Sequence, residues 1–251
     1  MPDLFERSPI AQAPLSVVLP AYRVEAQLKK VLDNWVAYLD TLGRDYEIFL
    51  INDGSSDRTV EPATALENKY PRVRHLPPPV QDGFGASLRI GLGAAQFPLL
   101  CYAECSDAYH PEDLGRLLEA IDKVDVVSGY RVWQSSRPRR PLRRFAYRTL
   151  LRLLFGLRLI DVDCPFKLFR RSVFARIPIQ SNGPFAHAEI LAKANFLGCI
   201  MTEVPVRYEP GNRGAGTHPF PATWRREAFR VFFHPDFGPP FLPEEAPPPQ
   251  L

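Results

Sequence analysis

The stretch LSVVLPAYRVEAQL, residues 15–28, joins an apolar, β-branched run to a helical pattern. Its first part, 15–20, ends at a proline and predicts a buried strand. From 25 to 42, apolar side chains then recur at steps of three and four residues, which predicts a helix. A strand followed directly by a helix is the repeating unit of α/β sheets.

The same alternation continues along the chain and predicts an α/β fold, a mostly parallel sheet with helices on both faces. The further predicted strands are 46–52, 73–76, 99–103, 125–129 and 202–208, and the further predicted helices are 59–70, 83–96, 111–121 and 186–197. Ligands of such sheets bind beyond the carboxyl ends of the strands. Three polar clusters of the N-terminal half fall at those ends: 20–22, 52–54 and 104–107.

The composition is that of a soluble globular protein with a substantial core, because 45% of the 251 residues are hydrophobic and 24% are charged. The four cysteines show no metal-binding spacing, and we expect them to be reduced thiols in a cytosolic protein. We find no signal-peptide pattern and no apolar stretch of about 18 residues, so we expect no membrane span. The glycine motifs of Rossmann and P-loop nucleotide sites are also missing from the sequence.

Four segments in order resemble the family 2 glycosyltransferases: LSVVLPAYRVEAQL, YEIFLINDGSSDRTVE, DGFGASLRIGLGAA and the acidic segment before HPEDL. Later segments, GYR, DVDCPFKLFRRSVF, AHAEILAKANFLG and EVPVRYEPGNRGAG, resemble the branch typified by dolichyl-phosphate mannosyltransferase. The resemblance covers about 14–217. It implies an A-type glycosyltransferase fold and an inverting transfer of a hexose from a UDP- or GDP-linked sugar to a polyprenyl phosphate.

The resemblance also implies a donor site. It assigns Asp53 to the base, Glu25 to the ribose or base, and Pro20, Ala21 and Tyr22 to the same site. Taken alone, Asn-Asp-Gly-Ser around Asp53 is ordinary turn chemistry. Gly83 and Gly85 precede a predicted helix, where backbone N–H groups can approach a phosphate, although a plain turn explains them equally well.

The acidic segment departs from the family pattern, which usually carries Asp-x-Asp to hold Mg²⁺ or Mn²⁺ on the diphosphate. Here Glu104 takes the first position and Ser106, which supplies no charge, takes the second. Asp107 can replace it only if the backbone turns, because residues 104 and 107 of a regular strand point to opposite faces. We expect a weakened or rearranged metal site formed by Glu104, Ser106 and Asp107, with His110 as an additional candidate ligand. A binding protein that kept the fold and lost the chemistry is therefore an alternative function.

On the acceptor side, a phosphate is already a nucleophile at neutral pH, so the enzyme mainly supplies positioning and positive charge. By resemblance, Arg131, Arg144, Lys167 and Arg213 would hold that phosphate, and Asp161 and Glu189 match carboxylates of the family. The candidate catalytic residues are Glu104, Asp107, Arg131, Lys167, Glu189 and Arg213. A transferase with a saccharide acceptor is a further alternative.

Eight arginines lie between residues 137 and 159. Arginines four residues apart alternate with Phe145, Leu150, Leu153 and Leu154, which predicts an amphipathic helix over part of 137–160. Such a helix either contacts an anionic membrane or remains solvated. Nucleic-acid binding is disfavoured, because no aromatic platform or recognition motif accompanies the arginines.

These patterns predict one glycosyltransferase domain over 14–217. They also predict a C-terminal extension over 218–251, whose proline-rich tail is expected to be disordered. The expected location is the cytoplasm, with peripheral contact at the inner face of the cell membrane.

Overall fold

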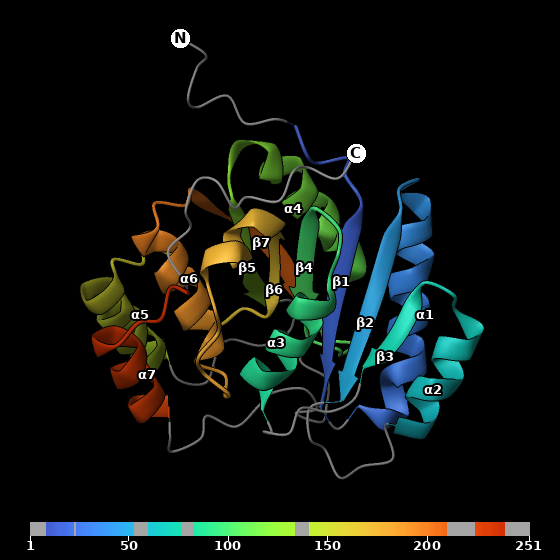
Figure 1. Ribbon diagram of the computed structural model, residues 1–251, viewed down its shortest axis with the longest axis horizontal. Helices are drawn as coiled ribbons and strands as arrows, with labels where there is room; N and C mark the ends of the chain where they lie inside the picture. Colours follow the sequence, from blue (N-terminus) through green and yellow to red (C-terminus); the bar gives the residue numbers. More distant parts are fainter. Residues whose placement is uncertain are drawn as a thin grey trace.

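The computed structural model describes residues 9–22, 24–52, 60–76, 83–133, 141–209 and 224–238. In these ranges the chain forms a central sheet flanked by helices (Figure 1). The strands are β1 (Leu15–Ala21), β2 (Tyr46–Asn52), β3 (Val73–Leu76), β4 (Leu99–Ala103), β5 (Val126–Trp133), β6 (Phe166–Arg170) and β7 (Met201–Tyr208). The helices are α1 (Glu25–Thr41), α2 (Val60–Lys69), α3 (Phe84–Ala94), α4 (Leu114–Ala120), α5 (Pro141–Phe155), α6 (Ala186–Phe196) and α7 (Trp224–Phe233).

The strands form a single sheet in the order β3-β2-β1-β4-β6-β5-β7. Neighbouring strands are parallel except for β6, which runs antiparallel to both β4 and β5. The predicted α/β class is therefore confirmed. The carboxyl ends of β1, β2, β4, β5 and β7 lie along one edge of the sheet, together with the amino end of β6.

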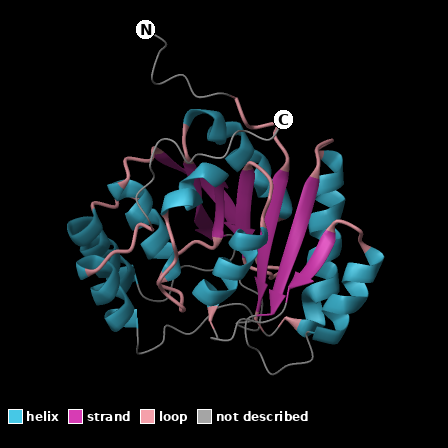
Figure 2. Cartoon of the chain, viewed as in Figure 1, coloured by secondary structure: helices cyan, strands magenta, loops and turns pink. Residues whose placement is uncertain are grey.

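The sheet separates two hydrophobic cores, because successive side chains of a strand point to opposite faces. In β1, Val17 and Leu19 belong to the core under α1, α2 and α4, whereas Val18 belongs to the core under α3, α5, α6 and α7. Figure 2 shows helices on both sides of the strands. The helices α5 and α7 lie side by side at one end of the molecule, where the rings of Phe155 and Phe232 are 5.5 Å apart (Figure 1).

Three predicted strands, β2, β3 and β4, have the predicted bounds. The predicted strand 125–129 continues to Trp133, and the predicted helix 111–121 begins with a 3-10 turn, Pro111–Asp113. The sequence did not predict β6 or α7. The helix α7 packs on the second core through Val231, which is buried.

Two further expectations can be compared with the structure. All four cysteines are free thiols. No helix in the described ranges is long and apolar enough to cross a membrane.

Candidate functional site

The acidic segment forms a turn directly after β4. Glu104 is half-buried, and its backbone N–H donates a hydrogen bond to the carbonyl oxygen of Pro165, which precedes β6 (3.0 Å). Ser106 is buried, and its hydroxyl accepts a long hydrogen bond from the N–H of Ala108 (3.4 Å). The backbone contacts therefore fix this turn against the start of β6.

The backbone does turn at this point, but the turn does not bring Asp107 into the place of Ser106. The side chain of Asp107 is 43% exposed, and its carboxylate lies 3.9 Å from the ammonium of Lys30 in α1. Within the described residues, no three His, Cys, Asp or Glu side chains form a group that could hold a metal ion. The described residues of this turn therefore do not form a ready-made metal site, because Ser106 is neutral and the carboxylate of Asp107 faces the ammonium of Lys30.

His110, the additional candidate ligand, directly follows Tyr109. Its Nε2 is 3.7 Å from a carboxylate oxygen of Glu209, which follows β7. This contact ties His110 to the end of β7 instead of to Glu104.

Arg131, near the end of β5, is paired with Asp161. Nε and Nη2 of the guanidinium each donate a hydrogen bond of 2.7 Å to one carboxylate oxygen of Asp161, and the backbone N–H of Arg131 donates a third of 3.2 Å. Burial opposes the charge of Arg131, but the bonds with Asp161 outweigh it and hold the pKa of Arg131 well above its usual value. A two-pronged pair of this kind fixes the orientation of the guanidinium.

The segment 160–164, which leads into β6, is held by side chains from two strands. Glu203 in β7 accepts hydrogen bonds from the N–H groups of Ile160 (2.6 Å) and Asp161 (3.0 Å). Lys167 in β6 is fully buried, and its ammonium donates to the carbonyl oxygens of Val162 (3.0 Å) and Cys164. Lys167 was expected to hold a substrate phosphate, but in this structure its ammonium organises the segment next to Arg131.

Asp163 lies in the same segment and contacts α5. The hydroxyl of Tyr147 donates a hydrogen bond to its carboxylate (3.2 Å). Burial raises the pKa of the Asp163 carboxyl to about 6, although the positive charges of Arg131 and Lys167 oppose the shift. A carboxyl group with such a pKa changes its charge close to neutral pH.

Aromatic side chains gather beside Arg131. The guanidinium carbon of Arg131 lies 5.6 Å from the ring centre of Tyr208, at the end of β7. The ring of Tyr208 contacts Trp133 on β5 (4.8 Å between centroids) and Tyr109 in the turn after β4 (5.1 Å). The ends of β4, β5 and β7 therefore meet in one cluster of aromatic and charged groups.

Gly83 and Gly85, at the start of α3, allow the segment 181–183 to approach closely. The N–H of Gly85 donates to the carbonyl oxygen of Asn182 (2.7 Å). A Cβ atom added at Gly83 would lie 2.5 Å from that oxygen, and one at Gly85 would lie 2.1 Å from the carbonyl oxygen of Ser181. Gly83 also has a φ of +124°, which favours glycine. The close approach of 181–183 explains both glycines, so the N–H of Gly85 is already bonded and is not presented to a phosphate.

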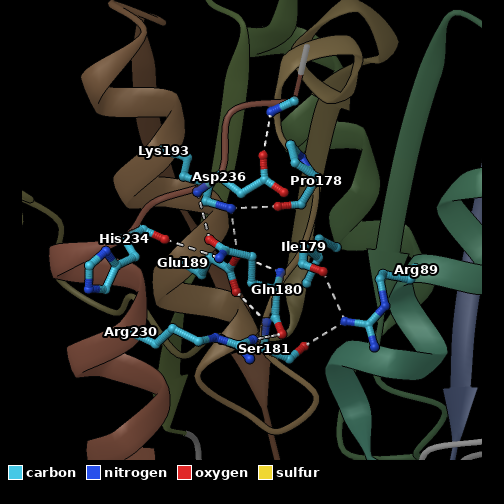
Figure 3. A network of polar contacts seen from close by, with 11 residues as sticks. Arg89, Pro178, Ile179, Gln180, Ser181, Glu189, Lys193, Arg230, His234 and Asp236 are labelled. Atoms are coloured by element: carbon cyan, nitrogen blue, oxygen red, sulfur yellow. Dashed lines mark hydrogen bonds and ion pairs between the residues drawn. The ribbon is translucent and has the colours of Figure 1, made fainter.

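Glu189 is part of a buried polar network (Figure 3). Its carboxylate accepts hydrogen bonds from the backbone N–H groups of Gln180 (2.6 Å) and Ser181 (2.7 Å) and from the ammonium of Lys193 (2.7 Å). Glu189 and Lys193 have no exposed surface. Glu189 was a candidate catalytic residue, but its carboxylate is fully used in shaping the segment 178–183.

The same segment joins α3 to α7. Arg89 in α3 donates to the carbonyl oxygens of Ile179 (2.9 Å) and Ser181 (3.1 Å), and Arg230 in α7 donates to the carbonyl oxygen of Gln180 (Figure 3). The side chain of Gln180 also accepts a hydrogen bond from the N–H of Asp236 (2.9 Å). The segment 178–183 is therefore held from both sides.

The remaining expected donor and acceptor residues are only partly described. Pro20 and Ala21 are buried at the end of β1, and Tyr22 is half-buried directly after it. Asp53 and Arg213 lie outside the described residues. Glu25 begins α1 and Arg144 lies in α5, but the positions of their side chains are not described.

Sequence reasoning missed several residues of this site. Tyr109, Trp133, Asp163, Glu203 and Tyr208 were not singled out. Trp133 and Tyr208 end strands at the carboxyl edge, so the rule that ligands bind beyond that edge could have indicated them. The pairings of Asp163 and Glu203 join segments far apart in the sequence and leave no local signal.

Comparison with known proteins agrees with this architecture. A family model for glycosyl transferase family 2 matches residues 16–177. A dolichyl-phosphate beta-glucosyltransferase of Trichomonas vaginalis is 31% identical over 212 residues, which cover 77% of this chain and 65% of that protein. An undecaprenyl-phosphate 4-deoxy-4-formamido-L-arabinose transferase of Edwardsiella ictaluri is 27% identical over 209 residues, 80% of this chain and 61% of that protein. The chain thus spans less than two thirds of the length of these two relatives.

Among solved structures, glucosyl-3-phosphoglycerate synthase from Mycobacterium tuberculosis superposes with a TM-score of 0.67 at 20% identity, over 88% of this chain and 80% of the synthase. Another structure of that synthase, in complex with Mn²⁺ and UDP, superposes with a TM-score of 0.64. At this identity the likeness shows the fold, which is the A-type glycosyltransferase fold expected from the sequence. Because the family model matches more than half of the chain, the chain belongs to glycosyl transferase family 2.

Proposed function

We propose that this chain transfers a hexose from a UDP- or GDP-linked sugar to a polyprenyl phosphate, with inversion at the anomeric carbon. One observation carries the proposal: Glu104 and the Arg131–Asp161 pair stand at one edge of the sheet, at the ends of β4 and β5. The curated relatives, which are named as transferases that act on dolichyl or undecaprenyl phosphates, support the choice of acceptor.

In the proposed reaction, a phosphate oxygen of the acceptor attacks the anomeric carbon of the sugar. The new carbon–oxygen bond forms as the bond to the nucleoside diphosphate breaks, and the diphosphate leaves with the electron pair. The attacking phosphate is already ionised, so the protein needs no strong general base. Positive charge near the acceptor phosphate reduces its repulsion from the donor diphosphate.

The proposal gives the candidate residues two kinds of role. Arg131 and Arg213 are proposed to face the acceptor phosphate, and Glu25 and Asp53 the nucleotide. Lys167 and Glu189 are proposed as positioning residues, because their charged groups bond to backbone atoms of 162–164 and 180–181. Arg131 is aligned for its role by Asp161, and Asp161 is in turn fixed by the backbone bonds around Glu203.

A divalent ion remains a proposal to be tested by binding. Mn²⁺ accompanies UDP in a structure of the neighbouring synthase. In this chain, the carboxylate of Asp107 faces the ammonium of Lys30, and Ser106 adds no charge. We therefore derive no step of the reaction through a metal.

Peripheral membrane contact is also part of the proposal. The outer face of α5 exposes Phe145, Leu150 and Leu153 beside the exposed Arg148 and Arg152, and the adjacent α7 exposes Phe229 and Phe233. Mixed basic and apolar surfaces of this kind bind anionic membranes. Such contact would bring the site to an acceptor whose chain lies in the bilayer.

The proposed donor can be tested by thermal melting with UDP- and GDP-sugars, with and without Mn²⁺. A ligand that binds only the folded chain raises the melting temperature. A shift with one nucleotide sugar, followed by turnover on an isoprenyl phosphate, supports the transferase. Donor binding that is independent of Mn²⁺ and gives no turnover supports the alternative, a nucleotide-sugar-binding protein without catalysis. The buried neutral side chain of Ser106 favours that alternative.

A further inference from the structure

The hydroxyl of Tyr109 is a buried hydrogen-bond donor that has no partner among the described residues. The side chain of Tyr109 is 5% exposed, and its hydroxyl oxygen makes no hydrogen bond with the residues that the structure describes. Nearly all buried polar groups of native proteins are paired, and an unpaired one costs free energy. An exception in the middle of a candidate site therefore calls for a functional explanation.

A second unpaired donor lies close by. Nε1 of Trp133 is buried and makes no hydrogen bond within the described part of the chain. The rings of Tyr109 and Trp133 both contact the ring of Tyr208, at centroid distances of 5.1 Å and 4.8 Å. Two unsatisfied donors thus flank one aromatic ring, where the ends of β5 and β7 meet the turn after β4.

The backbone holds Tyr109 firmly in this place. Tyr109 forms an isolated antiparallel bridge with Tyr208, and the N–H of Glu209 donates to the carbonyl oxygen of Ala108 (3.0 Å). The ring of Tyr109 also packs edge-on against Phe166 at the start of β6 (6.3 Å). The unpaired hydroxyl is therefore not the result of a loosely held side chain.

The groups around Tyr109 indicate what kind of acceptor atom its hydroxyl would bind. A tyrosine phenol is protonated at neutral pH, so this hydroxyl can donate a hydrogen bond. Arg131 lies beside this cluster, with its guanidinium carbon 5.6 Å from the ring centre of Tyr208, and Glu104 opens the turn that carries Tyr109. Both are candidate substrate residues, so the hydroxyl belongs to the same end of the sheet as the candidate site.

We propose that the hydroxyl of Tyr109 and the indole N–H of Trp133 donate hydrogen bonds to an oxygen atom of a bound substrate. The shared chemistry is a phosphate or hydroxyl oxygen, which either the nucleotide sugar or the isoprenyl phosphate can supply. This inference rests on the proposed function and adds two substrate-binding residues to it. The free energy lost by leaving the donors unpaired in the ligand-free chain is recovered when the substrate binds.

The test compares Tyr109→Phe and Trp133→Phe with the wild-type chain. Tyr46→Phe is the matched control, because the hydroxyl of Tyr46 is paired with Asp40 (2.6 Å) at the opposite edge of the sheet. Three quantities are measured: the melting temperature without ligand, the shift caused by UDP-glucose, GDP-mannose or farnesyl phosphate, and kcat/KM for transfer. Tyr46→Phe should lower the melting temperature and leave kcat/KM unchanged.

Tyr109→Phe should keep or raise the melting temperature of the ligand-free chain and lower kcat/KM at least tenfold. If the melting-temperature shift becomes smaller only with the nucleotide sugars, the oxygen belongs to the donor. If it becomes smaller only with farnesyl phosphate, the oxygen belongs to the acceptor. Either result supports the proposal, and Trp133→Phe should weaken the same arm.

The proposal is overturned if Tyr109→Phe retains wild-type shifts and kcat/KM, or if its melting temperature falls as that of Tyr46→Phe does. Absence of transfer by the wild-type chain contradicts the proposed function alone, because the two binding arms still test Tyr109. A wild-type chain that binds neither probe contradicts both.

Discussion

At the scale of single residues, Asp163 shows how the fold tunes one carboxyl group. The negative charge of Asp161 raises its pKa, and the positive charges of Arg131 and Lys167 lower it. Its carboxylate also accepts a hydrogen bond from the hydroxyl of Tyr147. Burial is the largest effect and raises its pKa to about 6. At neutral pH the folded chain therefore holds this carboxylate in a place where its charge is disfavoured.

A dependence of stability on pH follows. The ordinary pKa of an aspartate is about 3.9. Between about pH 4 and 6 the folded chain keeps a proton that the unfolded chain has released. The contribution of Asp163 is thus fully present below about pH 4 and is lost as the pH rises through 6. Asp163→Asn should raise the free energy of unfolding at pH 7.5 by about 1–2 kcal/mol, a few degrees in melting temperature, after allowance for partial exposure to solvent.

The same substitution should have little effect at pH 4, where the wild-type carboxyl is protonated. Melting curves at the two pH values measure the difference. If Asp163→Asn lowers the melting temperature equally at both, the carboxylate is stabilised by Arg131 and Lys167 and the pKa argument fails.

Ser106 gives a second prediction at this scale. Its side chain is 2% exposed, so Ser106→Asp places a carboxylate in a buried position. We expect this variant to lose about 1–3 kcal/mol or more of stability, because an unpaired buried polar group is costly, whereas Ser106→Ala should lose less than about 1 kcal/mol. Melting with and without Mn²⁺ checks this. A stable Ser106→Asp chain in the absence of metal would show that the side chain can turn towards solvent.

At the scale of elements, the segment 178–183 joins three helices. Glu189 and Lys193 of α6 hold it from beneath, Arg89 holds it to α3, and Arg230 holds it to α7 (Figure 3). The glycines before α3 permit the close approach. The helices α3 and α7 are thus tied to each other through this segment.

Removing one charge from the buried pair should weaken this junction strongly. Glu189→Gln leaves the ammonium of Lys193 buried without its carboxylate, which costs about 3–5 kcal/mol, or roughly 10 °C in melting temperature. The control is Lys29→Gln, which removes a pair of the same i,i+4 spacing whose lysine is 71% exposed. That change should cost about 0.5 kcal/mol or less. Equal losses in the two variants would contradict the role of Glu189 as a structural residue.

The exposed basic and apolar side chains of α5 and α7 lead us to predict binding to anionic membranes. Arg148→Gln combined with Arg152→Gln should weaken binding to anionic phospholipid vesicles by about tenfold or more, because each basic residue at such a surface contributes about 1 kcal/mol. Co-sedimentation with vesicles measures the effect. The control is Lys123→Gln, an exposed cation that follows α4 on the other face of the sheet. Equal binding by both variants would remove α5 from the proposed membrane surface.

The elements that the sequence predicted are those with strong local periodicity. In β1, β2 and β4, apolar runs end at polar clusters, and the strands β1 to β4 were predicted within one residue. The strand β6 was hidden because Lys167 interrupts its apolar pattern, and a buried lysine is recognisable only from the carbonyl groups around it. Its antiparallel direction depends on contacts with β4 and β5 that no local pattern contains.

The candidate site was predicted in outline only. The rule that ligands bind at carboxyl ends predicts a site at this edge of the sheet, and the turn at 104–107 lies there. The sequence could not show that Arg131 pairs with Asp161, thirty residues away, or that Glu189 and the glycines of α3 serve the segment 178–183. Such pairings depend on which strands become neighbours in the sheet.

At the scale of the whole molecule, the candidate site lies at the carboxyl edge of the central sheet. The helices α5 and α7, at one end of the molecule, expose basic and apolar side chains. The net charge of +3 is small, but the arginines of α5 concentrate positive charge at that end.

The most direct measurement is product analysis after incubation with UDP-glucose or GDP-mannose and farnesyl phosphate. We expect a glycosyl prenyl phosphate of inverted anomeric configuration, formed by the wild-type chain and at least tenfold more slowly by Arg131→Gln. A chain that binds a nucleotide sugar but only hydrolyses it, or that glycosylates a saccharide and leaves the prenyl phosphate unchanged, would contradict the account.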